Sequence, residues 1–318
     1  MRLLLIFIAL VACLTAPASA RAFEFHNIQL ESQVAALFQG SRDIAEIKLT
    51  IDRMVEPGVD VAANLQIING MAADLERMRA EAGVTSDLDK LAILRRYIYE
   101  PGPWNGGKAF SYDLDDPMGV RPENRLLSDY LGDRRGNCVS MPMLMMILGN
   151  RMGLLMTLAE APQHSLIKFT DSEGREWNLE ATSGGGFTRE SHYRKEMPSL
   201  TETAIKNGVY LRGLPRDEMI AGEVSGMLVA HLIGTGRLED AVAVSDQLLT
   251  KAPKSIRLKL ARASVLSLLL KRDITDRYKR MNEMTPDIRA YADDLYRQNM
   301  AAFAEAEALG WREPGGKF

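Results

Sequence analysis

The segment RRGNCVS, residues 134–140, leads directly into an apolar run from Met141 to Leu148. A histidine follows in APQHSLI, residues 161–167, and a carboxylate follows in WNLEAT, residues 177–182. The apolar run predicts a helix, and the two later segments predict strands. The chain therefore supplies Cys138, His164 and Glu180 in an order, and on kinds of element, that can build a thiolate nucleophile.

The residues around the cysteine favour a reactive thiol. Gly136 permits a close approach of the chain and Asn137 is a suitable helix cap, so Cys138 is expected in the first helical turn, where the helix dipole favours a thiolate. Free backbone N–H groups at that helix end are candidates to hold an oxyanion, and we expect Gly136 and Asn137 at the rim of the site. Pro142 predicts either a local kink or a helix that begins later, nearer Ser140.

Two side chains compete to orient the histidine. His164 is expected to open a strand and Glu180 to end the next antiparallel strand, so that the two side chains face each other near one end of a hairpin. Asn178 lies two residues away on the same face of that strand, and an amide plays this part in papain-like enzymes. The sequence favours Glu180, with Asn178 as the alternative orienter.

The first twenty residues are expected to form a signal peptide. Arg2 supplies a positive start, residues 3–14 form an apolar core, and ASA at 18–20 is a small-residue cleavage site that would leave Arg21 at the mature N-terminus. LVAC at 10–13 is the alternative, a lipoprotein signal that would place a lipid on Cys13. We expect an exported protein, periplasmic or secreted, with a membrane anchor only if Cys13 is lipidated.

The cysteine count makes the thiol conspicuous. The chain has two cysteines, and cleavage of the leader would leave Cys138 without a partner in the chain. In an oxidising compartment, a leftover thiol indicates either a reactive group or pairing with another chain. A buried cysteine that acts as a small apolar side chain is the alternative.

The 318 residues are enough for two domains with cores of their own. Helical periodicity dominates residues 21–84, helix and strand patterns share residues 85–215, and residues 220–318 are helical again, which predicts the α+β class. Residues 101–125 are expected to be a functional loop. In the last part, Ala241 lies 12 residues before Pro253, and Pro286 follows 33 residues later, a spacing typical of tetratricopeptide repeats. A plain helical tail is the alternative.

Several classes of function are disfavoured. The formal net charge is −3 with both signs mixed, and no basic stripe with interleaved aromatic residues occurs, which argues against nucleic-acid binding. Asp113, Asp115 and Asp116 lack the later ligands of an EF-hand and are expected in a solvated loop. The histidines show no zinc spacing. We expect neither a metal nor a cofactor.

The quoted segments resemble the transglutaminase-like superfamily, and more narrowly its bacterial branch with a transglutaminase-type core and a tetratricopeptide-like tail. The resemblance rests on RGNC at 135–138, PQH at 162–164 and NLEATSG at 178–184, and it covers about residues 85–190. It implies a papain-like α+β core with Cys138 as nucleophile, His164 as base and Glu180 as third member of a triad. Asp is usual at that last position, so the longer Glu departs from the family pattern.

The residues and the resemblance together predict an exported thiol enzyme that acts on amide or peptide bonds through an acyl-enzyme, by hydrolysis or acyl transfer. The expected substrate is a protein or peptide, and peptidoglycan peptides are within reach of the compartment. The alternative is a non-catalytic protein- or peptide-binding module of the bacterial envelope that uses the same groove, with a further partner on the helical tail. A third possibility is a structural envelope protein whose Cys138 pairs with a partner chain.

Overall fold

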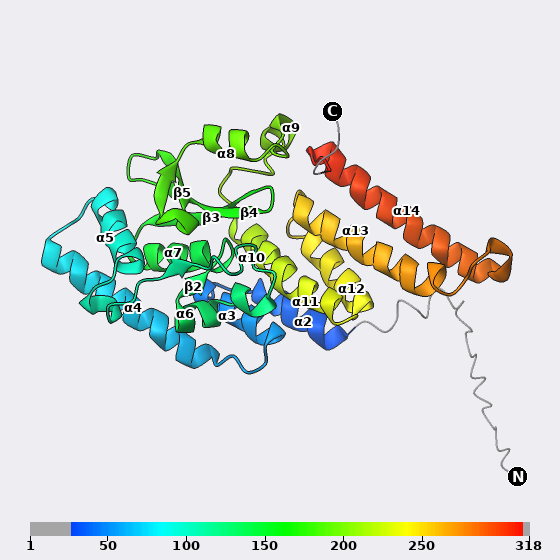
Figure 1. Cartoon of the computed structure of the whole chain (residues 1–318), viewed down its shortest axis with the longest axis horizontal. Helices are drawn as coiled ribbons and strands as arrows, with labels where there is room; N and C mark the ends of the chain where they lie inside the picture. Colours follow the sequence, from blue (N-terminus) through cyan, green and yellow to red (C-terminus); the bar gives the residue numbers. More distant parts are fainter. Residues whose placement is uncertain (1–26, 314–318) are drawn as a thin grey trace, which may run out of the picture.

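The computed structural model describes residues 27–313, and the chain has a mixed helix-and-sheet fold (Figure 1). The α+β class expected from the sequence is thus confirmed at this level. The predicted signal peptide, its cleavage site after Ala20 and the alternative lipid site at Cys13 lie outside the described residues. Within the described part, the search for a helix with the length and apolar character needed to span a membrane finds none.

Four helices open the described chain, and each begins at a residue whose side chain accepts a hydrogen bond from a backbone N–H of the first turn. These caps are Asn27, Asp43, Asp60 and Ser86. The helices are α2 (Ile28–Leu37), α3 (Ile44–Val55), α4 (Val61–Ala82) and α5 (Asp87–Tyr99).

The segment after α5 is the irregular one, with two 3-10 turns, η1 (Pro103–Asn105) and η2 (Pro122–Arg125). It also contains a strand that the sequence patterns did not predict. This strand, β1 (Ser111–Tyr112), pairs in parallel with β2 (Arg135–Gly136), immediately before the cysteine. Helix α6 (Leu127–Asp133) links the two strands. The loop is thereby fastened to the chain that carries the thiol.

A buried helix and an antiparallel sheet form the centre of the molecule. Helix α7 (Ser140–Arg151) is buried at every residue from 140 to 149, as expected for a helix that is apolar on all faces. It packs with α4, α5, α6 and the sheet in one hydrophobic core. The sheet is a meander of β3 (Leu155–Ala161), β4 (His164–Thr170), β5 (Glu176–Glu180) and β6 (Gly186–Thr188).

The rest of the described chain is helical. Two short helices, α8 (Glu190–Glu196) and α9 (Glu202–Lys206), follow the sheet. Next come α10 (Arg216–Val224), the π-helical turn η4 (Ser225–Val229), α11 (Ala230–Gly234) and α12 (Leu238–Leu249). The last elements are α13 (Ile256–Leu270), the π-turn η5 (Lys271–Thr275), the 3-10 turn η6 (Met281–Glu283) and α14 (Pro286–Leu309), with α13 and α14 packed side by side (Figure 1).

A second hydrophobic core joins the two ends of the chain. Apolar residues of α2 and α3, such as Val34 and Ile51, pack with residues of α10 to α13, such as Leu232 and Leu266. Val139, the residue after the cysteine, packs against this second core, whereas Met141 belongs to the first. The thiol therefore lies on a short loop held between the two cores.

Candidate active site

The cysteine lies just before helix α7 and not inside it. The helix begins at Ser140 with Val139 as its N-cap, so the prediction that Cys138 occupies the first helical turn is wrong. Pro142 then falls within the first turn, where its missing N–H would have no intrahelical partner in any case, and it requires no kink. The alternative start near Ser140 is the one observed.

Asn137 and Gly136 are buried residues that fix the loop that carries Cys138. Asn137 is completely buried; its Oδ1 accepts a hydrogen bond from the Val139 N–H at 2.9 Å, and its Nδ2 donates to the Asn124 carbonyl at 2.9 Å. A Cβ at Gly136 would lie 2.7 Å from the Tyr130 ring, so only glycine fits there without a shift. Both residues are buried, and the prediction that they form the site rim is wrong.

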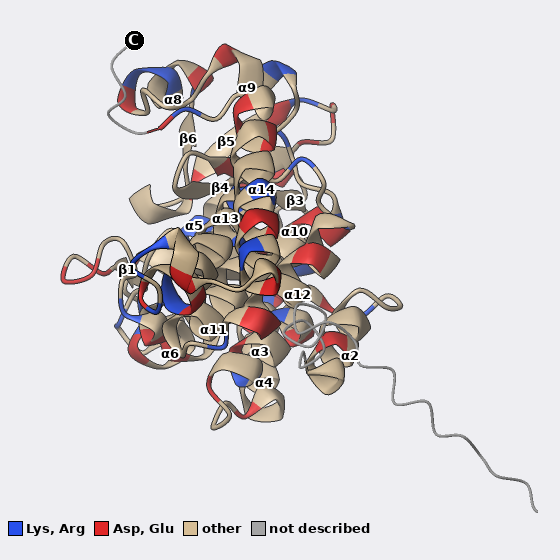
Figure 2. Ribbon diagram, turned by 90° about the vertical axis from the view of Figure 1, so that its right-hand side faces the viewer, with Lys and Arg blue, Asp and Glu red and all other residues tan. Residues whose placement is uncertain are grey.

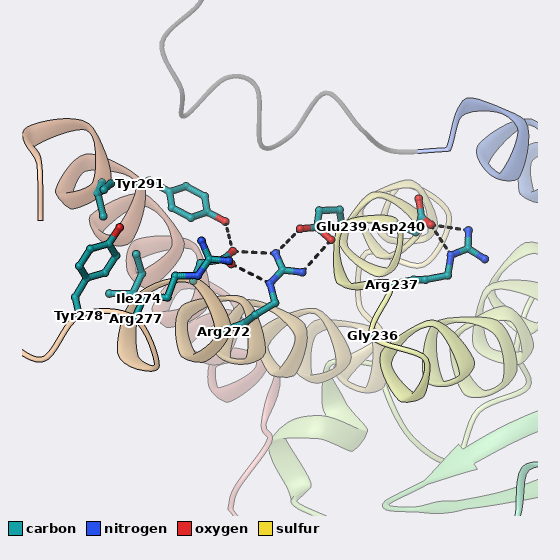
Figure 3. Close-up of a pocket in the computed structure, with 11 residues that line it drawn as sticks. Gly236, Arg237, Glu239, Asp240, Arg272, Ile274, Arg277, Tyr278 and Tyr291 are labelled. Carbon is teal, nitrogen blue, oxygen red and sulfur yellow. Dashed lines mark hydrogen bonds and ion pairs between the residues drawn. The ribbon is translucent and has the colours of Figure 1, made fainter.

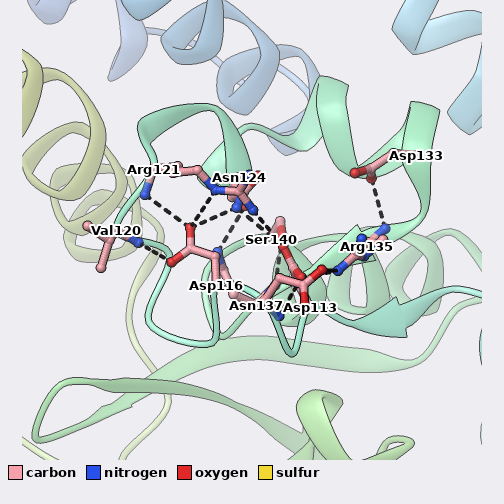
Figure 4. Close-up of polar contacts among 10 residues, drawn as sticks. Asp113, Asp116, Val120, Arg121, Asn124, Asp133, Arg135, Asn137 and Ser140 are labelled. Carbon is pink, nitrogen blue, oxygen red and sulfur yellow. Dashed lines mark hydrogen bonds and ion pairs between the residues drawn. The ribbon is translucent and has the colours of Figure 1, made fainter.

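An acidic loop fixes the position of Asn124, and through it that of Asn137 (Figure 4). Asp116 accepts hydrogen bonds from Asn124 Nδ2 at 2.7 Å and from the Val120 N–H at 2.7 Å. Asp113 pairs with Arg135 and Arg121. Because Asp113 and Asp116 are 3% and 6% exposed, the expectation of a solvated loop is wrong for these two residues. It holds for Asp115, whose side chain is 75% exposed.

The histidine meets both proposed partners. His164 is the first residue of β4, and Glu180 is the last of β5. The register pairs Ile167 with Leu179, which sets Glu180 diagonally across from His164 on the same face of the sheet. His164 Nε2 lies 2.9 Å and 3.0 Å from the two Glu180 carboxylate oxygens. The Cys138 side chain lies close enough to the imidazole to raise the pKa of His164, and because Nε2 faces Glu180, Nδ1 is the ring nitrogen left to face the sulfur.

These contacts set the charge state of the pair. The side chains of His164 and Glu180 are 17% and 11% exposed. Burial by itself would lower the pKa of His164, but the hydrogen bonds with Cys138 and Glu180 and their negative charge outweigh it and raise the pKa to about 9. Burial would likewise raise the pKa of Glu180, but its hydrogen bonds, first of all with His164, hold that pKa below its usual value. The arrangement favours a protonated imidazole held against the Glu180 carboxylate.

Two further residues hold the carboxylate, and the sequence did not single them out as site residues. Tyr193 OH donates to Glu180 Oε1 at 2.5 Å, and Thr182 Oγ1 donates to Oε2 at 3.2 Å. Thr182 stands two residues after the acid, within the WNLEAT segment. Tyr193 comes from α8 and carries no local signal, because it reaches Glu180 only after the chain has turned at Gly184 and Gly185, both at positive φ, and passed through β6.

The alternative orienter does not reach the histidine. Asn178 pairs across the sheet with Lys168 and Thr188, and its Nδ2 donates to the Thr188 carbonyl at 3.2 Å. It makes no contact with His164, which lies further along β4. The structure therefore leaves Glu180 as the residue placed to orient the imidazole.

An open cleft of about 850 Å³ gives access to the pair. His164 and Glu180 line it, together with residues of β6, α8 and the preceding turns and with Tyr112. Burial and the nearby charge of Cys138 raise the pKa of Tyr112, whose hydroxyl donates to the Pro117 carbonyl at 2.7 Å. Cys138 itself is a partly exposed, free thiol. No described residue accepts a hydrogen bond from its backbone N–H.

The helical tail also contacts the sheet, near the end of β3. Arg257 of α13 pairs with Glu160 near the end of β3, at 2.7 Å. The Glu160 carboxylate raises the pKa of Arg257, and the charge of Cys138 adds to this effect. A smaller cavity of about 190 Å³ lies beside this pair, between the turn Pro162–Gln163 and α13. The tail thus contributes a cation to the electrostatic surroundings of the thiol.

A second large pocket, of about 670 Å³, lies within the tail between α12, η5 and α14 (Figure 3). Its charged side chains pair with one another: Arg272 contacts Glu239 and Asp273, and Arg237 contacts Asp240. None of the three predicted triad residues lines it. Across the described chain, no group of three or more His, Cys, Asp or Glu side chains is placed to hold a metal ion.

Residues 63–220 match a family model described as the Transglutaminase-like superfamily. The comparisons with curated proteins and with solved structures found no match. The matched residues run from α4 into α10 and include α7, the loop before it and all four strands of the meander. Cys138, His164 and Glu180 therefore fall within the match. The chain contains a transglutaminase-like superfamily domain at residues 63–220.

Proposed function

We propose that this protein is a cysteine-dependent enzyme that acts on amide or peptide bonds through an acyl-enzyme. The observation that carries the proposal is the placement of His164 between two groups: the nearby Cys138 side chain, which raises the pKa of His164, and the Glu180 carboxylate, 2.9 Å from Nε2. A thiol paired with an imidazole, which a third group orients, is the arrangement that activates a sulfur nucleophile. These three residues fall within the match to the transglutaminase-like superfamily, which supports the same function.

The proposed reaction proceeds in two steps. The Cys138 sulfur attacks the carbonyl carbon of the substrate amide while the carbonyl π electrons move to oxygen, and the unpartnered Cys138 N–H is a candidate donor to that oxyanion. When the oxyanion collapses, the C–N bond breaks and His164 gives its proton to the leaving amine. Water or a second amine then attacks the thioester carbonyl and gives a proton to His164; when this second oxyanion collapses, the C–S bond breaks and Cys138 leaves as the thiolate. Hydrolysis and acyl transfer share this intermediate.

The proposal extends to the architecture. A nucleophile just before a buried helix, packed on an antiparallel sheet that carries the base and the acid, supports a papain-like core at about 85–215, preceded by the helical segment 21–84. For residues 220–318 we propose a tetratricopeptide-like tail. Ala241 is fully buried in α12 and Pro253 lies in the short loop before α13, which supports one repeat unit.

We also propose export to the periplasm or the medium, on the strength of the N-terminal sequence alone. A protein or peptide substrate, peptidoglycan peptides included, fits that compartment. The competing function is a non-catalytic peptide-binding module. It is supported by the pocket of about 670 Å³ in the helical tail, which none of the three predicted triad residues lines.

The deciding experiment is alkylation of Cys138 by iodoacetamide as a function of pH, in the parent protein and in His164→Ala. The proposal expects fast labelling that persists from about pH 8 down to about pH 6 in the parent, because the imidazolium holds the sulfur as a thiolate. Labelling in His164→Ala should fall steeply over the same range. Slow labelling that is indifferent to His164 would refute the activated pair and leave the binding module as the function.

A further inference from the structure

The cleft beside the proposed triad has one strongly polar wall. Residues of β6 and α8 form it, and they carry hydroxyls and cationic side chains toward the cleft. These residues are Thr188, Arg189, Ser191, His192 and Lys195. His164 and Glu180 line the same cleft, so a ligand bound along this wall also meets the imidazole that lies beside Cys138.

The cations on this wall have no acidic partner inside the cleft. Arg189 is exposed, and no described carboxylate lies within ion-pair distance of its guanidinium. Lys195 pairs only with its chain neighbour Glu196, at 3.4 Å, where both side chains are mostly exposed. Glu180 is the single carboxylate that lines the cleft, and it is already engaged with His164, Tyr193 and Thr182.

The acids of α8 do not line the cleft. The ribbon of α8 carries both blue and red segments in Figure 2, so the charge of the cleft depends on which residues face it. Glu190 lies 3.9 Å from Lys168 and 3.8 Å from Arg194, and neither Glu190 nor Arg194 lines the cleft. Helix α8 therefore places Lys195 at the cleft, whereas its Glu190–Arg194 pair lies outside the cleft.

We propose that this cleft binds an acidic peptide, with Arg189 and Lys195 as the partners of carboxylates that flank the amide attacked by Cys138. The inference rests on the proposed function only for the identity of the attacked bond. A cleft of about 850 Å³ lined by hydroxyls suits several consecutive peptide residues. The unpaired Arg189 and the exposed, weakly paired Lys195 on its wall select for anionic peptide residues, because opposite charges are attracted at such a surface.

The test measures binding without turnover. The full chain carrying Cys138→Ala is titrated against two fluorescein-labelled probes, the hexapeptide Gly-Glu-Gln-Glu-Glu-Gly and the same peptide with every Glu replaced by Gln. Two ion pairs at an exposed site predict a preference for the acidic probe of about 5- to 20-fold at low salt. That preference should shrink at about 0.5 M salt, where the screening length is a few ångströms.

Matched variants locate the effect. Arg189→Gln with Lys195→Gln should abolish the preference, whereas Arg194→Gln, a cation on the same helix that does not line the cleft, should preserve it. Thermal melting checks that each variant is folded. Equal affinity for the two probes, no saturable binding of the acidic probe, or an Arg194→Gln effect as large as that of the double variant would each overturn the inference.

The design separates this inference from the proposed function. A protein whose thiol proves unreactive, but whose binding keeps the charge-dependent preference, would refute the enzyme and retain the acidic-peptide cleft. An active thiol enzyme that does not prefer the acidic probe would retain the proposed function and refute the acidic-peptide cleft.

Discussion

Raising the pH from 6.5 to 9 is expected to destabilise the protein through His164. The pKa of this histidine is about 9 in the folded chain, because Cys138 and Glu180 stabilise the imidazolium. In the unfolded chain the pKa returns to about 6.5. Between these values the folded state binds a proton that the unfolded state has lost, so the stability falls as the pH rises.

The structure sets the size of the effect. A difference of about 2.5 pH units corresponds to about 3 kcal/mol, fully present below pH 6.5 and gone above pH 9. Solvent screening reduces this little, because the His164 and Glu180 side chains are only 17% and 11% exposed. A Cys138 thiolate opposes this slope, because it releases a proton on folding. The His164 slope is therefore measured in the Cys138→Ala background, where it is smaller because one partner is gone, and His164→Gln should remove it.

The assay is urea unfolding at pH 6, 7, 8 and 9 for Cys138→Ala and for Cys138→Ala with His164→Gln. His192→Gln in the same background is the control, since His192 lies on the rim of the same cleft, is exposed and pairs with no described carboxylate. The free energy of unfolding of Cys138→Ala should fall toward that of the His164→Gln double variant as the pH rises, while the His192→Gln double variant follows Cys138→Ala. Parallel curves for Cys138→Ala and the His164→Gln double variant would refute the assignment of a stabilised imidazolium.

Three further outcomes are expected. Glu180→Gln should lower activity on any amide substrate by about 100-fold or more with the fold retained, because His164 loses its orienting anion; the assay is kcat/KM beside a thermal melt. Gly136→Ala should cost about 1–3 kcal/mol in urea unfolding, because its Cβ would lie 2.7 Å from the buried Tyr130 ring. Lys48→Met should cost about 3–5 kcal/mol, because it leaves the fully buried carboxylate of Asp52 without its cation, and a variant as stable as the parent would contradict this.

Local sequence patterns were sufficient for the elements that carry the triad. The apolar run after Cys138 and the strand pattern around His164 and Glu180 each specify a structure within a few residues. Because side chains alternate along strands, the position of Glu180 at the end of β5 was enough to predict which way it faces. The fold class followed from the order of these patterns.

The parts that could not be predicted depend on contacts between distant residues. The parallel pairing of β1 with β2 involves only two residues of each strand, too few for any periodicity. Tyr193 reaches Glu180 because of a glycine turn and a helix that follow the strand. The sequence predicted Asp113 as a solvated acid because its cations are not adjacent in the chain. Arg121 follows it by 8 positions, and Arg135 follows it by 22 positions and lies beyond α6. Burial of such charges is decided by tertiary packing.

Val139 gives the two-core arrangement a practical meaning for anyone who expresses or evolves this protein. Because its side chain packs with α2, α3 and the tail helices, the segment 63–220 would, if cut out alone, lose one of the two supports of its nucleophile loop. Excision would also uncover apolar partners such as Leu126, which is 3% exposed. The segment that carries Cys138, His164 and Glu180 therefore depends for its packing on the helices that precede and follow it, and a change in the packing of the tail helices also reaches the residue next to the sulfur.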